Sequence, residues 1–186
     1  MTDTAEHEQP GGADPAVADP FHAHDHAHCA ATVLSRAEAQ ARAEGVRLTP
    51  VRRRVLEILL ESHRAMGAYE VLERLAAEGF GKQPPVAYRA LDFLVEQGFA
   101  HRVRRLNAYA ACLSEQRDHS PAFLICRICE QVAEAESPAL RAAIAALGAG
   151  TGFAVERSTI ELLGLCAGCA ARGQVAAHDH HPGDPA

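Results

Sequence analysis

The chain has 186 residues, 48% of them hydrophobic, and a formal net charge of −6 at pH 7, which suits one medium domain or two small ones. No apolar run reaches the roughly 18 residues of a membrane span, and the acidic N-terminus lacks the basic and apolar regions of a secretory signal, so we expect a cytoplasmic protein with no membrane partner. Residues 46–112 carry more Lys and Arg than Asp and Glu while the rest is acidic, which favours a local anion-binding module.

The two ends of the chain are predicted to be disordered. Residues 1–31 are polar, contain Pro and Gly, and show no hydrophobic periodicity. They end in the His-rich tract FHAHDHAHC, and residues 174–186 repeat the pattern with HDHH. Such tracts bind metal weakly and without fixed geometry. They are interpreted as solvated tails, with a metal buffer or a third metal site as alternatives.

Residues 32–112 are predicted to form a winged helix-turn-helix domain. Residues 33–44 favour a helix, and a second one begins with Thr49 as N-cap and Pro50 as first residue. Two more are expected over residues 68–78 and from Pro84 to Gly98. A β-hairpin around the RLN sequence at residues 105–107 follows. The last helix would enter the major groove while basic residues hold phosphates.

Residues 121–173 are predicted to form a small α/β unit, joined to the first domain by a hinge at residues 113–120. Strands flank the sequence CRIC, a helix follows Ser137, and another strand leads into the sequence CAGC. The expected fold class is therefore α+β. A unit of this size often needs a metal or oligomerisation to remain folded.

Two Cys-x-x-Cys pairs, Cys126/Cys129 and Cys166/Cys169, dominate the second half of the chain. Two such pairs supply the four tetrahedral ligands of a structural zinc ion. A disulfide framework is disfavoured in a reducing compartment. A thiol–disulfide redox centre would place one pair at a helix N-terminus, whereas both pairs here follow strand-like segments. Structural zinc is the preferred interpretation, and the redox centre remains the alternative.

Four further residues could ligate a metal between the two halves: His101, Cys112, His119 and Glu134. Each has a simpler interpretation by itself: a phosphate contact, a buried small hydrophobe, a loop residue and a solvated charge. Together they come from two domains and their linker. A site built in this way assembles in only one relative orientation of the domains, as a metal-dependent switch requires.

The sequence resembles the ferric uptake regulator family, and within it the zinc uptake regulator branch. The resemblance covers about residues 33–172 and is carried by RLTPVRRRVLEIL, AYEVLERL, PPVAYRALDFLVEQGFAHRV and FLICRICEQVAE…GLCAGC. It implies a homodimeric repressor with a winged-helix DNA-binding domain and an α/β dimerisation domain. With metal bound, such a repressor closes onto double-stranded, AT-rich palindromic operators.

The resemblance also assigns residues to roles. The two Cys-x-x-Cys pairs match the family's structural zinc site, and the set His101, Cys112, His119 and Glu134 matches the zinc branch's regulatory site, which implies about two Zn²⁺ per chain. Tyr69 and Arg89 match base-contacting positions, and Arg89 could bond guanine through its bidentate fork. Tyr88 and Arg52 complete the expected DNA contacts. Val86 departs from the family's Thr, and His119 lacks the second nearby His of iron-sensing relatives.

The predicted function is zinc-responsive repression of zinc uptake and homeostasis genes. A thiolate, two imidazoles and a carboxylate suit Zn²⁺ better than an all-N/O site would. The alternatives are a repressor of the same fold that responds to iron, another metal or peroxide, a cytosolic thiol oxidoreductase, and a metal buffer. No enzyme is expected, because four Cys ligands leave a zinc ion without an open position and the deaminase signature is absent.

Overall fold

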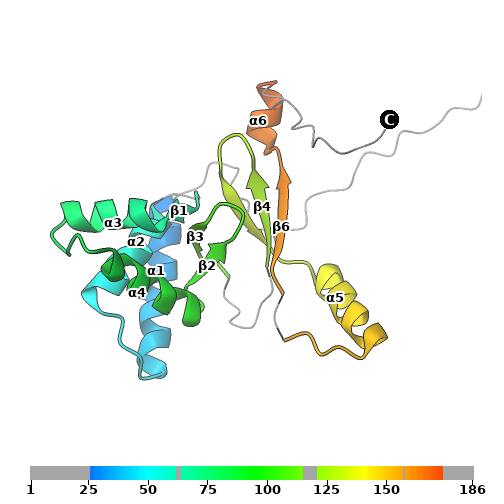
Figure 1. Cartoon of the computed structure of the whole chain (residues 1–186), viewed down its shortest axis with the longest axis horizontal. Coiled ribbons are helices and arrows are strands. Elements are labelled where there is room, and N and C mark those ends of the chain that lie inside the picture. Colours follow the sequence, from blue (N-terminus) through cyan, green and yellow to red (C-terminus); the bar gives the residue numbers. More distant parts are fainter. Residues whose placement is uncertain (1–25, 62–63, 115–120, 157, 174–186) are drawn as a thin grey trace, which may run out of the picture.

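The computed structural model of the protein describes residues 26–61, 64–114, 121–156 and 158–173. The helices are α1 (His26–Ala43), α2 (Pro50–Leu60), α3 (Ala68–Ala77), α4 (Pro84–Glu96), α5 (Pro138–Thr151) and α6 (Ala167–Ala171). The strands are β1 (Met66–Gly67), β2 (Ala100–Val103), β3 (Ala108–Ala111), β4 (Ala122–Cys126), β5 (Val132–Ala135) and β6 (Ile160–Gly164). Figure 1 shows α1 to α4 gathered together, the hairpin β2–β3 beside them, and the strands β4 to β6 beyond it. No helix in the described part of the chain is long and apolar enough to cross a membrane.

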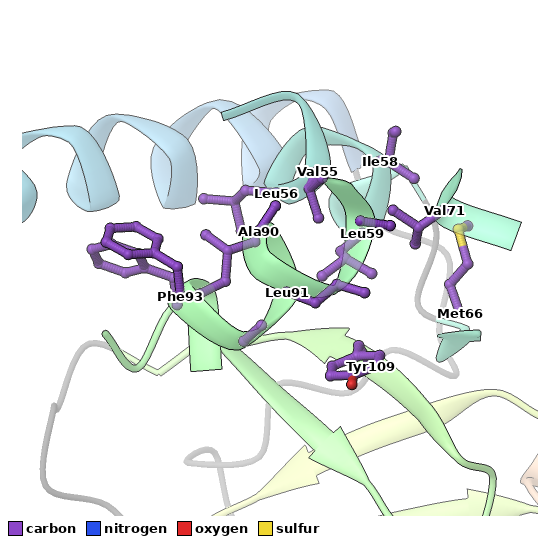
Figure 2. Packing of buried hydrophobic residues seen from close by; sticks show 14 of the residues in the cluster. Val55, Leu56, Ile58, Leu59, Met66, Val71, Ala90, Leu91, Phe93 and Tyr109 are labelled. Atoms are coloured by element: carbon purple, nitrogen blue, oxygen red, sulfur yellow. The ribbon is translucent and has the colours of Figure 1, made fainter. Parts of the chain in front are cut away.

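The first four helices form a small bundle with its own core. The Thr49 hydroxyl caps α2 by accepting a hydrogen bond from the Arg52 N–H at 3.4 Å, as predicted. The apolar faces of α2, α3 and α4 meet on Leu56, Leu75 and Leu91, all fully buried. In Figure 2, side chains of these helices pack together with Met66 and Tyr109 from the adjoining sheet.

The predicted hairpin is confirmed as β2 and β3, which pair antiparallel. Its turn spans residues 104–107, where Asn107 takes a positive φ of 46°, a conformation that asparagine tolerates better than most residues. The two-residue strand β1 adds to the far side of β3 and was not predicted, because two residues are too few for a hydrophobic pattern. Bundle and three-stranded wing sheet together make the expected winged helix-turn-helix.

The second unit is a three-stranded sheet in the order β5-β4-β6, with β4 antiparallel to β5 and parallel to β6. The predicted helix after Ser137 is α5, and the Ser137 hydroxyl caps it by accepting from the Leu140 N–H at 3.3 Å. Figure 1 shows α5 extending away from the sheet. The predicted α+β fold is confirmed.

One boundary differs from the prediction. Helix α1 begins at His26, inside the segment 1–31 that was expected to be disordered, because its alanine-rich sequence favours helix and Ala30 and Leu34 pack at the margin of the core. Residues 1–25 and 174–186, the rest of the predicted tails, lie outside the described residues. The predicted strand before the second Cys pair is β6, and Cys166 is in addition the N-cap of the short helix α6, which was not predicted.

The two units are packed against each other through the wing. A second hydrophobic cluster joins the wing sheet to the C-terminal sheet, with Val103 fully buried and Phe123 3% exposed. The other buried members of this cluster are Ala65, Ala108, Ile125 and Val132. Because this cluster is separate from the core of the helical bundle, the wing serves as the joint between the two units.

Candidate metal centres and nucleic-acid interface

The four cysteines of the two Cys-x-x-Cys pairs meet at one end of the C-terminal sheet. Cys126 ends β4, Cys129 lies in the following turn, and Cys166 and Cys169 belong to the N-terminal end of α6. Their sulfur atoms all lie within 4.8 Å of one another, and none of the four is in a disulfide. Parallel pairing of β4 with β6 is what brings the two distant pairs together.

The spacing of these sulfurs fits a tetrahedral zinc site. The Sγ atoms of Cys129 and Cys166 are 3.8 Å apart. With Zn–S bonds of about 2.3 Å, the edge of an ideal tetrahedron is about 3.8 Å. Cys126, Cys166 and Cys169 are buried, at 1%, 8% and 0% exposure. The four thiols therefore form a closed site with no open coordination position, which is typical of structural zinc.

The surroundings of the sulfurs shift the pKa values of neighbouring thiols in opposite directions. Burial by itself would raise the pKa of Cys126, but backbone N–H groups of Cys129, Cys166 and Ile128 oppose it and lower this pKa to about 6. Burial raises the pKa of Cys129 to about 12. Arg172 Nη2 donates to the Cys169 sulfur at 3.1 Å, and the Cys169 N–H donates to the Cys166 sulfur at 3.4 Å. A divalent cation bound between these neighbouring sulfurs would stabilise the thiolate form of all four.

The position of Cys166 at a helix N-terminus is the feature expected of a redox pair. Two observations favour the metal site nonetheless. The helix is only Ala167–Ala171, and the pair does not stand alone but faces the sulfurs of Cys126 and Cys129.

A second donor cluster lies between the two units. His101 on β2, Cys112 after β3 and Glu134 on β5 place one ligand atom each within 4.8 Å of one another. His101 Nε2 is 3.2 Å from Glu134 Oε1, and the Cys112 sulfur is 3.9 Å from the same oxygen. In a tetrahedral zinc site the corresponding separations are about 3.3 and about 3.5 Å. His119, the predicted fourth ligand, lies outside the described residues.

This cluster is well buried. Cys112 is 3% exposed, and the side chains of His101 and Glu134 are 18% and 7% exposed. Burial raises the pKa of Cys112 to about 12, and the Glu134 carboxylate adds to the effect. A cation at this place would favour the thiolate, so its binding must release the Cys112 proton.

Backbone contacts fix Cys112 and Glu134 in place. The Leu113 N–H donates to Glu134 Oε2 at 2.9 Å, which ties the chain after the wing to the C-terminal sheet. Arg36 of α1 donates to the carbonyls of Cys112 and Leu113 at 3.2 and 3.4 Å. Sequence reasoning did not find Arg36, since nothing in its helical pattern signals a contact 76 residues away. The cluster is thus supported from α1, from the wing and from β5.

The surface of α3 and α4 carries the predicted DNA contacts. Tyr69 and Tyr88 are 65% and 40% exposed, and their rings meet edge to face with centroids 6.3 Å apart. Arg89 is exposed beside them, and within the described residues no hydrogen bond or ion pair engages its side chain. By contrast, Arg53, Arg54 and Arg74 are paired with glutamates. Arg89 is thus available to an external acceptor.

Arg52 is placed differently from the other predicted DNA contacts. Its guanidinium lies over the Phe93 ring, 3.5 Å from the centroid, and donates to the Arg47 carbonyl at 2.7 Å. These contacts hold the side chain against α4. Arg52 could still contact a DNA phosphate from this position, but its side chain is less suited than that of Arg89 to contact a base.

The sequence comparisons agree with this geometry. The profile of the Ferric uptake regulator family matches residues 43–163. The chain belongs to the ferric uptake regulator family. It is 40% identical over 138 residues to the zinc uptake regulation proteins of Escherichia coli (strain K12) and of Shigella flexneri, which covers 74% of this chain and 81% of each relative.

Solved structures of the ferric uptake regulator family extend the likeness to the fold. A zinc uptake regulator complexed with zinc and DNA superposes with a TM-score of 0.74 at 37% identity, covering 77% of this chain and 97% of that one. Holo XcZur superposes with a TM-score of 0.66 at 34% identity, covering 79% and 99%. The likeness therefore includes both units of the chain.

Proposed function

We propose that this protein is a cytoplasmic, zinc-responsive transcriptional repressor that binds AT-rich palindromic operators and controls genes for zinc uptake and homeostasis. The observation that carries the proposal is the cluster of His101, Cys112 and Glu134, whose donors come from the wing on one side and the C-terminal sheet on the other. The likeness to a zinc uptake regulator complexed with zinc and DNA supports it.

The two clusters have different roles in this proposal, with about two zinc ions per chain. Cys126, Cys129, Cys166 and Cys169 would hold a structural ion, whose four bonds close the loop between the sheet and α6. His101, Cys112 and Glu134, with His119 as the proposed fourth ligand, would hold the regulatory ion. Bound zinc supplies the positive charge that stabilises the Cys112 thiolate beside the Glu134 carboxylate.

The regulatory residues act by fixing the wing to the C-terminal sheet. Ligands from both units reach one ion only when the units take a single orientation, so metal binding favours that orientation by its differential affinity. A coupling free energy of about 1–3 kcal/mol is usual for such a linkage. In a dimer the same orientation sets the distance between the two α4 helices, which must match two operator half-sites.

Exposed large apolar side chains of the C-terminal unit support the homodimer. They lie on α5, on the chain after it and on the edge strand β6, and they are 41–74% exposed: Leu147, Phe153, Val155, Leu162 and Leu163. Apolar surface of this kind is available to a protein interface. A second copy of the chain would cover part of it and place two winged helices about a two-fold axis, as a palindrome requires.

The α4 surface supplies the DNA contacts in this proposal. Arg89 would donate to guanine in the major groove through its two-pronged guanidinium. Tyr69 and Tyr88 would contact bases beside it, and Arg52 would hold a phosphate.

The test is specific DNA binding across buffered free zinc, measured by fluorescence anisotropy on DNA from upstream of the protein's own gene and of zinc-transporter genes. We expect binding that appears only as zinc rises, on labelled operator but not on shuffled DNA. A variant lacking residues 1–25 and 174–186 should respond in the same way, because both clusters lie outside these segments. Binding that follows iron or oxidant instead would make this a repressor with another effector. Absence of DNA binding under every metal would bring the thiol oxidoreductase and the metal buffer forward.

A further inference from the structure

The tip of the wing is held by one carboxylate of the C-terminal sheet. Glu161 on β6 accepts two backbone hydrogen bonds from the wing turn, at 2.6 Å from the Arg104 N–H and at 2.9 Å from the Arg105 N–H. Each of its two oxygens takes one N–H. Hydrogen bonds to an ionised acceptor are about twice as strong as neutral ones, and paired backbone N–H groups in a turn are a recurrent way to hold an anion.

Glu161 is placed opposite the regulatory cluster in the same row of the sheet. Phe123 on β4 pairs with Glu134 on β5 and with Glu161 on β6. Residues in register across a sheet point to the same face, so both carboxylates face the wing and flank the buried Phe123 ring. Glu134 reaches His101 on β2, and Glu161 reaches the turn that follows the same strand.

The wing is therefore held by two residues, Glu134 and Glu161, that lie in register with Phe123 across the C-terminal sheet. The contact through Glu134 involves the donors of the regulatory cluster, so a bound metal ion would strengthen it. The contact through Glu161 uses only backbone N–H groups and a carboxylate, so it needs no metal. Between them the apolar contacts of Val103 with the Phe123 cluster complete the joint.

We propose that Glu161 is a positioning residue that sets the orientation of the DNA-binding unit in the absence of ligands. Through this orientation Glu161 affects both the zinc affinity of the hinge and the operator affinity of the dimer. This inference rests on the proposed function. Because the wing tip is already held, the wing loses less conformational freedom relative to the C-terminal sheet when His101, Cys112 and Glu134 bind an ion. Loss of Glu161 should make the wing sample other orientations and weaken both binding events together.

Glu161→Gln and Glu161→Ala test the proposal against Glu130→Gln, which removes the same charge from an exposed position of the same unit. Gln keeps one acceptor and Ala keeps none. We expect operator affinity at saturating zinc to fall about tenfold in Glu161→Ala, less in Glu161→Gln, and not at all in Glu130→Gln. The direction is informative, because removing a negative charge by itself strengthens binding to DNA.

Two further measurements do not involve DNA. Hydrogen exchange at the Arg104 and Arg105 amides should quicken in both Glu161 variants, and zinc affinity at the hinge should fall, while zinc content of the four-cysteine site and the thermal unfolding midpoint of the bundle stay unchanged. If operator affinity, amide exchange and hinge zinc affinity all match those of Glu130→Gln, Glu161 does not position the wing. If the wild type itself shows no zinc-dependent DNA binding, the proposed function fails, and amide exchange and hinge zinc affinity still decide this proposal.

Discussion

We expect the Cys169→Ser substitution to unfold the C-terminal unit while the helical bundle stays folded. Cys169 is fully buried and is one of four sulfurs within 4.8 Å. A serine hydroxyl does not replace a thiolate on zinc at neutral pH. Structural zinc contributes about 10–16 kcal/mol in small zinc-binding peptides, and a whole domain is stable by only about 5–15 kcal/mol. The stabilising free energy lost with the ion is therefore larger than the stability that the small three-stranded sheet has without it.

Hydrogen exchange followed by mass spectrometry separates the two units in this experiment. Protection should vanish from β4, β5 and β6 and persist in α2, α3 and α4, whose core is a separate cluster. Ala170→Ser is the matched control, since it introduces the same hydroxyl at the next, exposed residue of α6. A Cys169→Ser protein with native protection in the C-terminal strands would show that the four cysteines do not hold the unit together.

The reactivity of the four thiols in the wild type decides between a structural zinc site and a redox centre. Thiols bound to zinc react slowly with a thiol reagent until a chelator removes the metal. We expect the purified wild type to release zinc in proportion to the thiols that become reactive. Rapid reaction of the four thiols without release of metal would favour the thiol oxidoreductase.

We expect the Cys112→Ser substitution to remove the zinc response and keep the fold. The Cys112 sulfur is 3.9 Å from Glu134 Oε1 and is the single thiol of the cluster. Serine therefore removes the thiolate ligand and changes the volume of the side chain very little. Operator affinity at saturating zinc should fall about 5–150-fold, the range of common allosteric couplings. The unfolding midpoint should change little, because serine is close to cysteine in size and its hydroxyl has an acceptor nearby in the Ser114 carbonyl, which lies 3.9 Å from the Cys112 sulfur.

The pH dependence gives this prediction a second readout. Burial raises the pKa of Cys112 to about 12 in the metal-free protein, so the thiol is protonated between about pH 7 and 9 and loses its proton when zinc binds. Hinge zinc affinity should therefore increase about tenfold per pH unit from this group alone. In Cys112→Ser the slope of log affinity against pH should be smaller by about one. Equal slopes in the two proteins would mean that Cys112 is not a ligand.

Local sequence signals predicted the elements that depend on few residues. Thr49 followed by Pro50, and Ser137 followed by Pro138, marked the starts of α2 and α5, and both hydroxyls make the cap bonds. The spacing of the two Cys-x-x-Cys pairs predicted a four-sulfur cluster because two such pairs are sufficient for one ion. The candidate ligands at the hinge were selected because they come from two domains and their linker, although each taken alone has a simpler interpretation. The family resemblance then matched them to a regulatory site.

Contacts between distant segments were not predictable from local pattern. The bond from the Arg104 N–H to Glu161 joins residues 57 apart, and it depends on how the wing docks on the sheet. Arg36 reaches the Cys112 carbonyl across a comparable separation. Arg52 was predicted as a DNA contact, but its packing on Phe93 was not predicted, because that contact depends on how α2 meets α4.

The central claim is that zinc at the hinge and operator DNA favour the same orientation of the wing. Linkage then requires the effect to be reciprocal: operator must raise hinge zinc affinity by the same factor by which zinc raises operator affinity. We would measure zinc affinity by competition with a chelator of known affinity, with and without saturating operator, in the wild type and in Cys112→Ser. The account predicts equal factors of about 5–150 in the wild type and a factor near one in the variant. Zinc affinity unchanged by operator in the wild type would contradict it.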